Sequence, residues 1–204
     1  MELQPGCTLK LTQDRGKGSA TGWLVWPVAL DLCRYLISKP DWIRNKSVLE
    51  LGAGTGAVGI ACGYIGAREV AITDRWDSLP ICISNVEANH QLLNSLSLVG
   101  VFELEWGNTK HLTEIKSTTG SFDLIIGSDI VYHQSEGILT ALVGTITSAS
   151  NGDTTVLIAY EDREGMIDDE EFFFAPMRTR FGSMECVDLG ADRTLFVFTG
   201  FITS

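Results

Sequence analysis

The chain has 204 residues, of which 45% are hydrophobic and 20% are charged, and its formal net charge at pH 7 is −11. These values predict one globular domain with a sizeable core, and the acidic charge argues against non-specific binding to nucleic acid. No apolar run approaches the length of a membrane span, and the chain does not begin like a secretory signal. The charge suits a basic protein partner, and it equally serves solubility alone.

The cysteines are scattered along the chain and odd in number. They are Cys7, Cys33, Cys62, Cys82 and Cys186. The central three lie within apolar helical patterns, so we interpret them as reduced core residues of an intracellular protein. Their spacing does not suggest zinc, and we expect no metal site. We expect a cytoplasmic location, with the nucleus as the alternative.

Residues 1–20 are polar and rich in turn residues. We expect a partly ordered lead there, and a single folded domain over residues 21–204. Thr8 to Thr12 predicts a short strand within the lead.

The first predicted helix begins at Pro27, which suits the first helical position, and its apolar spacing continues to about Lys39. Trp23 and Trp26 come just before this helix. They serve either as a stacking platform for a ligand or as core anchors, and the sequence does not decide between the two.

A glycine-rich turn between a strand and a helix is the most informative stretch of the chain. The run Val48 to Leu51 predicts a buried strand, Gly52, Gly54 and Gly56 follow at once, and a helix continues to about Ile65. Glycine lets a backbone turn tightly and approach a ligand, and the helix start offers unpaired N–H groups. This order of strand, turn and helix predicts a nucleotide site.

The next strand, Val70 to Ile72, is followed by the acid Asp74, placed where such folds hold a ribose. A helix is then predicted from Asp77 or Ser78 to about Leu93, with Asn85, Asn89 and His90 facing solvent or lining a groove. Leu98 to Leu104 predicts a strand, and Trp106 comes directly after it, where it serves as an adenine contact or as a core residue.

A second buried strand, Phe122 to Ile126, delivers Ser128, Asp129 and Tyr132 at its carboxyl end. In open α/β sheets, ligands bind beyond the carboxyl ends of the strands. We therefore expect these side chains on the same edge of the sheet as the glycine turn. The alternative is a turn cap for Asp129 and a core position for Tyr132.

The remaining chain predicts a helix from Ser135 to Ala149, a strand from Thr154 to Tyr160 and an acid-rich segment from Glu161 to Glu171. We interpret this segment mainly as a solvated helix start that opens at Asp168, although it also suits a basic substrate. Two strands, Met184 to Leu189 and Thr194 to Ile202, form a closing hairpin. The predicted fold is a Rossmann-like α/β domain, with a seven-stranded, mostly parallel sheet, helices on both faces and a C-terminal antiparallel hairpin.

Several of these motifs also resemble a known family. The turn from Glu50 to Gly56 resembles the first motif of class I methyltransferases that use S-adenosylmethionine, and its glycine spacing differs from the dinucleotide pattern. From about Trp23 to Phe201, the chain resembles the protein-lysine methyltransferases of the methyltransferase-like 21 type. The segments that carry this second resemblance are Val25 to Ala29, Glu50 to Gly56, Ile72 to Asp74, Trp106-Gly107, Gly127 to Tyr132, and Tyr160-Glu161 with Arg163.

The resemblance implies a set of site residues and a reaction. Contacts to S-adenosylmethionine are implied for Trp26, Glu50, Gly52, Ala53, Gly54, Asp74, Trp106 and Ser128. Positioning of the substrate lysine is implied for Asp129 and Tyr132. Independently of the resemblance, His133 is a less favoured candidate as proton acceptor. The implied partner is a protein substrate, such as a chaperone or a translation factor. We expect the protein itself to be a monomer.

Three other functions remain as alternatives. A methyltransferase for a small molecule or another nucleophile would use the same cofactor site. A non-catalytic subunit would keep the fold without the reaction. A nicotinamide dehydrogenase is disfavoured by the glycine spacing, and by Glu50, whose carboxylate near the turn suits a sulfonium cation better than a pyrophosphate.

Overall fold

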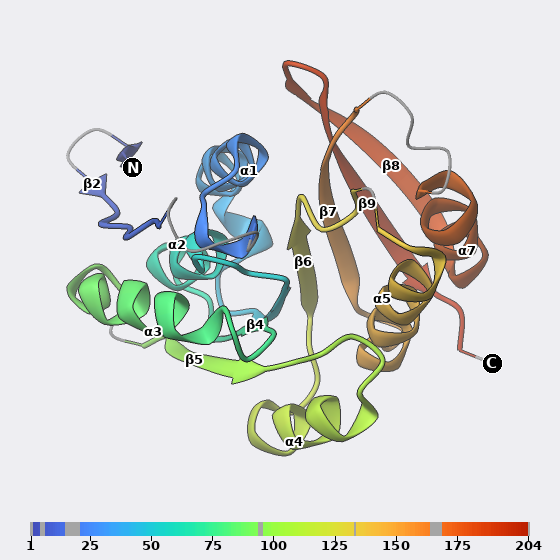
Figure 1. Cartoon of the computed structure of the whole chain (residues 1–204), viewed down its shortest axis with the longest axis horizontal. Coiled ribbons are helices and arrows are strands. Elements are labelled where there is room, and N and C mark those ends of the chain that lie inside the picture. Colours follow the sequence, from blue (N-terminus) through green and yellow to red (C-terminus); the bar gives the residue numbers. More distant parts are fainter. Residues whose placement is uncertain are drawn as a thin grey trace.

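The computed structural model describes residues 2–4, 7–14, 21–93, 96–132, 134–163 and 169–203. A seven-stranded sheet with the order β5-β4-β3-β6-β7-β9-β8 forms its centre (Figure 1). The strands are β3 (Ser47–Leu51), β4 (Glu69–Asp74), β5 (Leu98–Glu103), β6 (Leu124–Ser128), β7 (Thr155–Glu161), β8 (Phe181–Gly190) and β9 (Arg193–Phe201). The first five are parallel, and β9 is antiparallel to both β7 and β8. The predicted mostly parallel sheet with a closing hairpin is confirmed.

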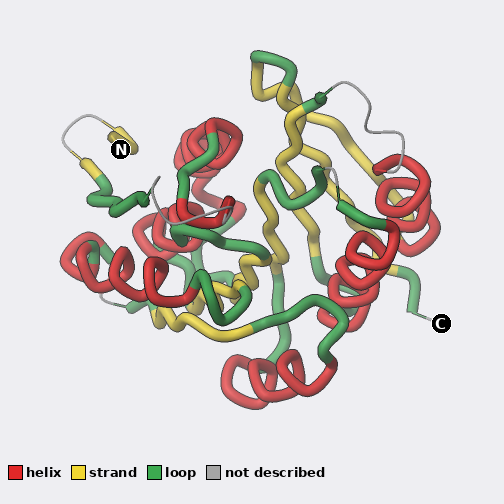
Figure 2. Tube along the Cα trace, in the orientation of Figure 1, coloured by secondary structure: helices red, strands yellow, loops and turns green. Residues whose placement is uncertain are grey.

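Helices cover both faces of this sheet (Figure 2). On one face lie α1 (Pro27–Ser38), α2 (Ala57–Ile65) and α3 (Leu79–Ala88), and on the other lie α4 (Thr109–Thr119), α5 (Glu136–Ala149) and α7 (Ala175–Arg180). Each face has its own apolar core: Leu32 and Ile60 belong to the first, and Leu142 and Phe198 to the second. The three layers follow from strands that are apolar on both faces.

The chain changes direction across the sheet between β3 and β6. It builds β4 and β5 on one side of β3, and then returns to build β6 and β7 on the other. The loops after β3 and β6 therefore part at this point and leave a crevice at the carboxyl ends of the strands. The glycine turn and Asp129 occupy these two loops, as the sequence predicts.

Several predicted elements differ from the structure in extent. The predicted helix to Leu93 ends at Ala88, and a short 3-10 helix, η3 (His90–Leu92), follows it. Helix α4 was not predicted, and Asn108 caps it by accepting hydrogen bonds from the Lys110 and His111 amides. Near the predicted opening at Asp168, a π-helical turn, η4 (Glu170–Phe174), precedes α7; Asp168 itself lies outside the described residues.

The N-terminal segment packs on α3. The predicted strand from Thr8 to Thr12 is wrong: a short strand, β2 (Cys7–Thr8), pairs with β1 (Glu2–Gln4), and residues 9–14 form no regular element. Leu9 is nevertheless buried in the core.

Asn85 and Asn89 hold this N-terminal segment in place. Asn89 Oδ1 accepts from the Lys10 amide at 2.8 Å, and Asn85 Oδ1 accepts from the Thr12 amide at 2.7 Å. The expectation that these asparagines face solvent or line a groove is wrong, because both are buried beneath the segment that they bind; His90 is exposed.

The buried thiols of Cys33, Cys62 and Cys82 are free and lie in the core, as predicted. Among the described residues, no helix has both the length and the apolar character needed to cross a membrane.

Candidate active site at the carboxyl ends of the strands

The glycine turn after β3 is tied to the end of β4 by three hydrogen bonds. Thr73 donates its hydroxyl to the Glu50 carbonyl at 2.6 Å, and the Ala53 amide donates to the Thr73 carbonyl at 3.0 Å. The Gly54 amide donates to Asp74 Oδ2 at 2.6 Å. These bonds fix the turn against the acid that ends the neighbouring strand.

The turn also needs glycine for steric reasons. Gly52 and Gly54 have φ values of +60° and +54°, in the left-handed region that disfavours a side chain. A Cβ on Gly54 would lie 2.7 Å from the Gly22 carbonyl oxygen, and one on Gly52 would lie 2.7 Å from Ile130 Cγ2 and 3.2 Å from Trp106 Cζ2. The bare backbone is therefore enclosed by the segment before α1 on one side and by Trp106 and Ile130 on the other.

Glu50 lies beneath the turn rather than at its surface. Its side chain is buried and Oε2 accepts a hydrogen bond from the Gly59 amide of α2 at 2.8 Å. Burial raises the pKa of Glu50 to about 8, with a smaller contribution from the nearby Asp74 carboxylate. At neutral pH this carboxyl is therefore largely protonated and joins β3 to α2.

Asp74 remains at the surface of the turn. Its Oδ1 atom accepts from the Arg75 amide at 2.7 Å, so each carboxylate oxygen has one backbone donor. Burial raises the pKa of Asp74, and the hydrogen bonds from Gly54 and Arg75 oppose that effect. Each oxygen keeps further lone-pair directions that can accept hydroxyl groups.

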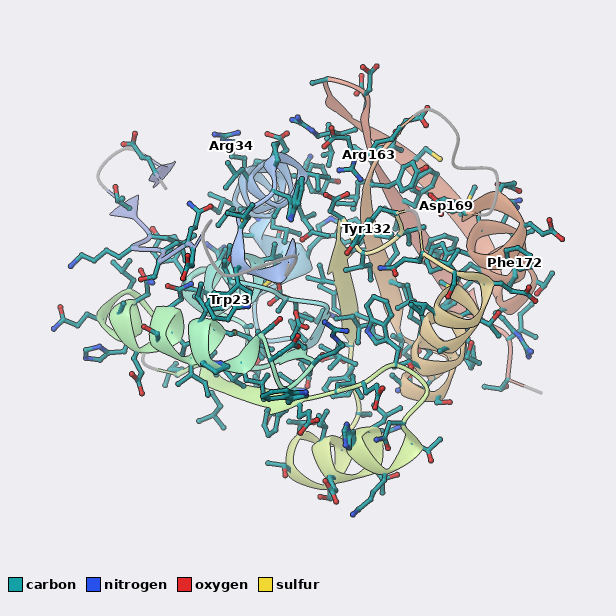
Figure 3. All side chains as sticks on the ribbon, in the orientation of Figure 1. Trp23, Arg34, Tyr132, Arg163, Asp169 and Phe172 are labelled. Carbon is teal, nitrogen blue, oxygen red and sulfur yellow. The ribbon has the colours of Figure 1, made fainter. Side chains whose placement is uncertain are left out.

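The loop after β6 places Asp129 beside β7. Its amide donates to the Ala159 carbonyl at 2.9 Å, and its φ of +54° turns the chain out of the strand. Both carboxylate oxygens accept from the Arg163 guanidinium at 2.8 Å, a contact that the sequence did not predict. Figure 3 shows Arg163 beyond β7 and Tyr132 in the loop after β6.

A cavity of about 590 Å³ joins these parts. It is lined by every predicted site residue except Glu50: Trp26, Gly52, Ala53, Gly54, Asp74, Trp106, Ser128, Asp129 and Tyr132. The volume is in the usual range for a small-molecule site. Trp26 lines this cavity and is 37% exposed, so it is not a buried core anchor, and its role as a ligand platform stays a prediction. Trp23 does not line the cavity.

Part of the cavity wall was not predicted from the sequence. The segment before α1 contributes Gly22, Leu24 and Val25 to this wall, and α5 contributes Ile138 and Ala141. For the residues before α1, the only sequence signal was their proximity to Trp26. The residues of α5 had no signal, because Ile138 belongs to the apolar stripe of a helix whose neighbours the sequence does not reveal. His133 lies outside the described residues.

The residues present fit S-adenosylmethionine. The glycine turn leaves room for close backbone approach, Asp74 offers acceptors at a strand end, and Trp106 supplies an aromatic wall in the same cavity. The fold and this site together define a class I methyltransferase dependent on S-adenosylmethionine.

Solved structures share this fold. A Thermus thermophilus 16S rRNA methyltransferase in complex with AdoMet and guanosine matches 89% of this chain and 44% of its own, with a TM-score of 0.63 and 21% identity. The Synechocystis magnesium protoporphyrin IX methyltransferase with bound SAH matches 84% of this chain and 81% of its own, with a TM-score of 0.56 and 13% identity. At these identities, the likeness concerns the fold alone.

The chain belongs to the lysine methyltransferase family, whose sequence model matches residues 3–180. It is 37% identical over 191 residues to the protein N-lysine methyltransferase METTL21A of Danio rerio, covering 93% of this chain and 81% of the relative. It is 35% identical over 159 residues to the EEF1A lysine methyltransferase 3 of Mus musculus, covering 78% of this chain and 63% of the relative. The predicted family, cofactor and reaction class are thereby confirmed: this is a protein-lysine methyltransferase that uses S-adenosylmethionine.

Proposed function

We propose that the cavity holds S-adenosylmethionine and the target lysine side by side, with the residues divided between them. Asp74 accepts the ribose hydroxyls, Trp106 contacts the adenine, and the backbone of Gly52, Ala53 and Gly54 follows the rest of the cofactor. Trp26 and Ser128 complete this half of the site. The support for this division is that all of these residues line one cavity at the switch point of the sheet.

The reaction needs a neutral amine in line with the methyl group. S-adenosylmethionine supplies a methyl group on a sulfonium, so that the lysine Nζ lone pair forms the N–C bond while the C–S bond breaks and its electrons pass to sulfur. The methylated ammonium then loses its proton to solvent. A free lysine has a pKa of about 10.4, so the neutral form is scarce at pH 7.

Asp129 and Tyr132 are the proposed partners of this amine. The Asp129 carboxylate accepts a hydrogen bond from the amine and so orients it, and the Tyr132 hydroxyl accepts a second hydrogen bond that directs the lone pair. The observation that carries this assignment is their position in the loop after β6, where both line the same cavity as the glycine turn.

For the substrate, we propose a translation factor of the EEF1A kind, since two curated relatives carry that protein in their names. A chaperone is the second candidate, as the family resemblance implies. The net charge of −11 favours a basic protein surface over nucleic acid. We further propose a monomer acting in the cytoplasm, with the nucleus as the alternative compartment.

The test is transfer of radiolabel from S-adenosylmethionine into recombinant EEF1A and into a cell lysate, with wild type beside Asp129→Asn. We expect a discrete protein band with the wild type and none with the variant. The variant should still bind S-adenosylhomocysteine within about threefold of the wild type, because Asp129 is assigned to the lysine.

Label confined to the small-molecule fraction would instead make this a methyltransferase for another nucleophile. No label at all, with the cofactor bound, would favour a non-catalytic subunit. Activity retained by Asp129→Asn would remove Asp129 from the assignment.

A further inference from the structure

Asp129 is the last member of a network of ion pairs in which acidic and basic side chains alternate. Arg163 binds both Asp129 oxygens at 2.8 Å and contacts Glu161 Oε2 at 3.4 Å. Arg193 Nε contacts the same Glu161 oxygen at 3.4 Å, and its Nη1 reaches Asp31 Oδ2 at 2.6 Å. This network of ion pairs thus joins the loop after β6 to β7, β9 and α1.

The inner end of this chain is shielded from solvent. The Asp129 side chain is 5% exposed and that of Arg163 is 26% exposed, so their attraction is screened less than at a free surface. The Arg163 guanidinium carbon also lies 5.9 Å from the centre of the Trp26 ring, which lines the cavity. Arg163 is therefore held by its partners next to the site without lining it.

This pairing bears on a difficulty in the proposed chemistry. A buried carboxylate alone attracts the ammonium form of lysine, which has no lone pair to attack the methyl group. With Arg163 bound to both oxygens, the pair carries no net charge. A bidentate guanidinium uses one lone pair on each oxygen, and the carboxylate keeps others for the amine.

We propose that Arg163 is a positioning residue that compensates the charge of Asp129, so that the target lysine binds as the neutral amine. This rests on the proposed role of Asp129. Glu161 does not cancel the charge compensation by Arg163, because the Glu161 oxygen that contacts Arg163 also contacts Arg193.

Among the described residues, the other titratable groups that act on Arg163 are Glu161 and Tyr160 of β7. The hydrogen bonds that Arg163 donates to Asp129 raise the pKa of the guanidinium, with smaller contributions from Glu161 and Tyr160, so Arg163 stays charged at every pH of the assay. Burial raises the pKa of Tyr160, which donates its hydroxyl to Asp169 at 3.2 Å. Beyond Glu161, Arg193 is in turn paired with Asp31.

The test compares Arg163→Gln, which removes the charge, with Arg163→Lys, which keeps it. Arg44→Gln is the matched control, since Arg44 is an exposed residue paired only loosely with Asp41, at 3.9 Å. The kcat and KM for recombinant EEF1A, or for the protein that the wild type labels in lysate, are measured from pH 7 to pH 10. The dependence of kcat on pH reports the ionisation of the bound lysine.

For Arg163→Gln, we expect kcat at pH 7.5 to fall roughly tenfold, because the pKa of the bound lysine rises by about one unit. KM should fall with it, since the ammonium form binds unproductively, and kcat should recover toward pH 10. Arg163→Lys should restore the wild-type inflection, and Arg44→Gln should leave the profile unchanged. Binding of S-adenosylhomocysteine within threefold of the wild type will show that each variant is folded.

A loss of kcat/KM that is the same at every pH would overturn the inference and leave only a structural role for Arg163. So would an unshifted kcat profile in Arg163→Gln. If Asp129→Asn is inactive in the same assay, either result spares the proposed function. If the wild type labels no protein, the proposed function fails first and the inference fails with it.

Discussion

The Gly54 amide donates a hydrogen bond of 2.6 Å to Asp74 Oδ2, and this contact joins the turn after β3 to the end of β4. One carboxylate thus both holds the glycine turn in shape and faces the cavity. We therefore expect a change at Asp74 to affect both the shape of the turn and the binding of the cofactor.

Replacing Asp74 by alanine should raise the dissociation constant of S-adenosylhomocysteine at least tenfold, because a hydrogen bond to a charged group contributes about 1.5–3 kcal/mol. Isothermal calorimetry measures this change. Asp74→Asn should recover part of the affinity, since it keeps an acceptor for the Gly54 amide. The nearby Asp77 does not line the cavity, and Asp77→Ala should bind like the wild type. Wild-type affinity in Asp74→Ala would exclude the ribose role.

Gly54→Ala should destabilise the fold more than an alanine at another left-handed glycine. The new Cβ would lie 2.7 Å from the Gly22 carbonyl oxygen, whereas a Cβ on Gly190, with φ of +82°, meets nothing within 4 Å. Gly190→Ala should therefore cost only the conformational term of about 1–2 kcal/mol. Urea denaturation compares the two variants. Equal losses would mean that the segment around Gly22 moves aside without cost.

The buried Glu50 should make stability depend on pH. The folded chain keeps this proton up to about pH 8, while the unfolded carboxyl releases it near its ordinary pKa of 4.5. Its contribution is therefore complete below pH 4.5 and is lost as the pH rises to about 8, at up to about 1.4 kcal/mol per pH unit.

Glu50→Gln imitates the protonated side chain and should remove this dependence. We expect the Tm of Glu50→Gln minus that of the wild type to increase between pH 5 and pH 8 and then to stay constant. Its affinity for S-adenosylhomocysteine should stay within about threefold, because Glu50 does not line the cavity. Parallel Tm curves would show that Glu50 is ionised in the folded chain.

Asn85→Ala should loosen the N-terminal segment and weaken the fold. Its side chain bonds the amide and carbonyl of Thr12 at 2.7 and 3.2 Å, and the Thr55 carbonyl at 3.0 Å. Loss of these three bonds should cost about 2–4 kcal/mol.

Hydrogen exchange should detect the same change as faster exchange of the Thr12 amide. Ser84 is exposed on the same helix, so Ser84→Ala is the matched control and should change stability by less than about 0.5 kcal/mol. Unchanged protection of Thr12 in Asn85→Ala would show that other contacts hold the segment.

The order of elements around the site was predictable because each carries a local signal. The buried strands of the parallel sheet are short apolar runs, the turn is marked by glycine, and Asp74 ends a strand. Helix α4 lacked such a signal: Leu112 and Ile115 are its only buried residues, and its remaining positions are polar. Its place depends on packing against α5, which local periodicity does not encode.

Sequence alone determined the sheet, the glycine turn and the placement of Asp74 and Asp129 at strand ends, because these depend on backbone conformation and on apolar runs within one segment. Tertiary structure decided where the polar side chains point. Val48, Leu49 and Leu51 are buried alongside Glu50, so alternation along this inner strand does not reveal that the carboxyl faces α2. Asp129 and Arg163 meet only because β6 and β7 are neighbours in the sheet, which brings together residues 34 positions apart.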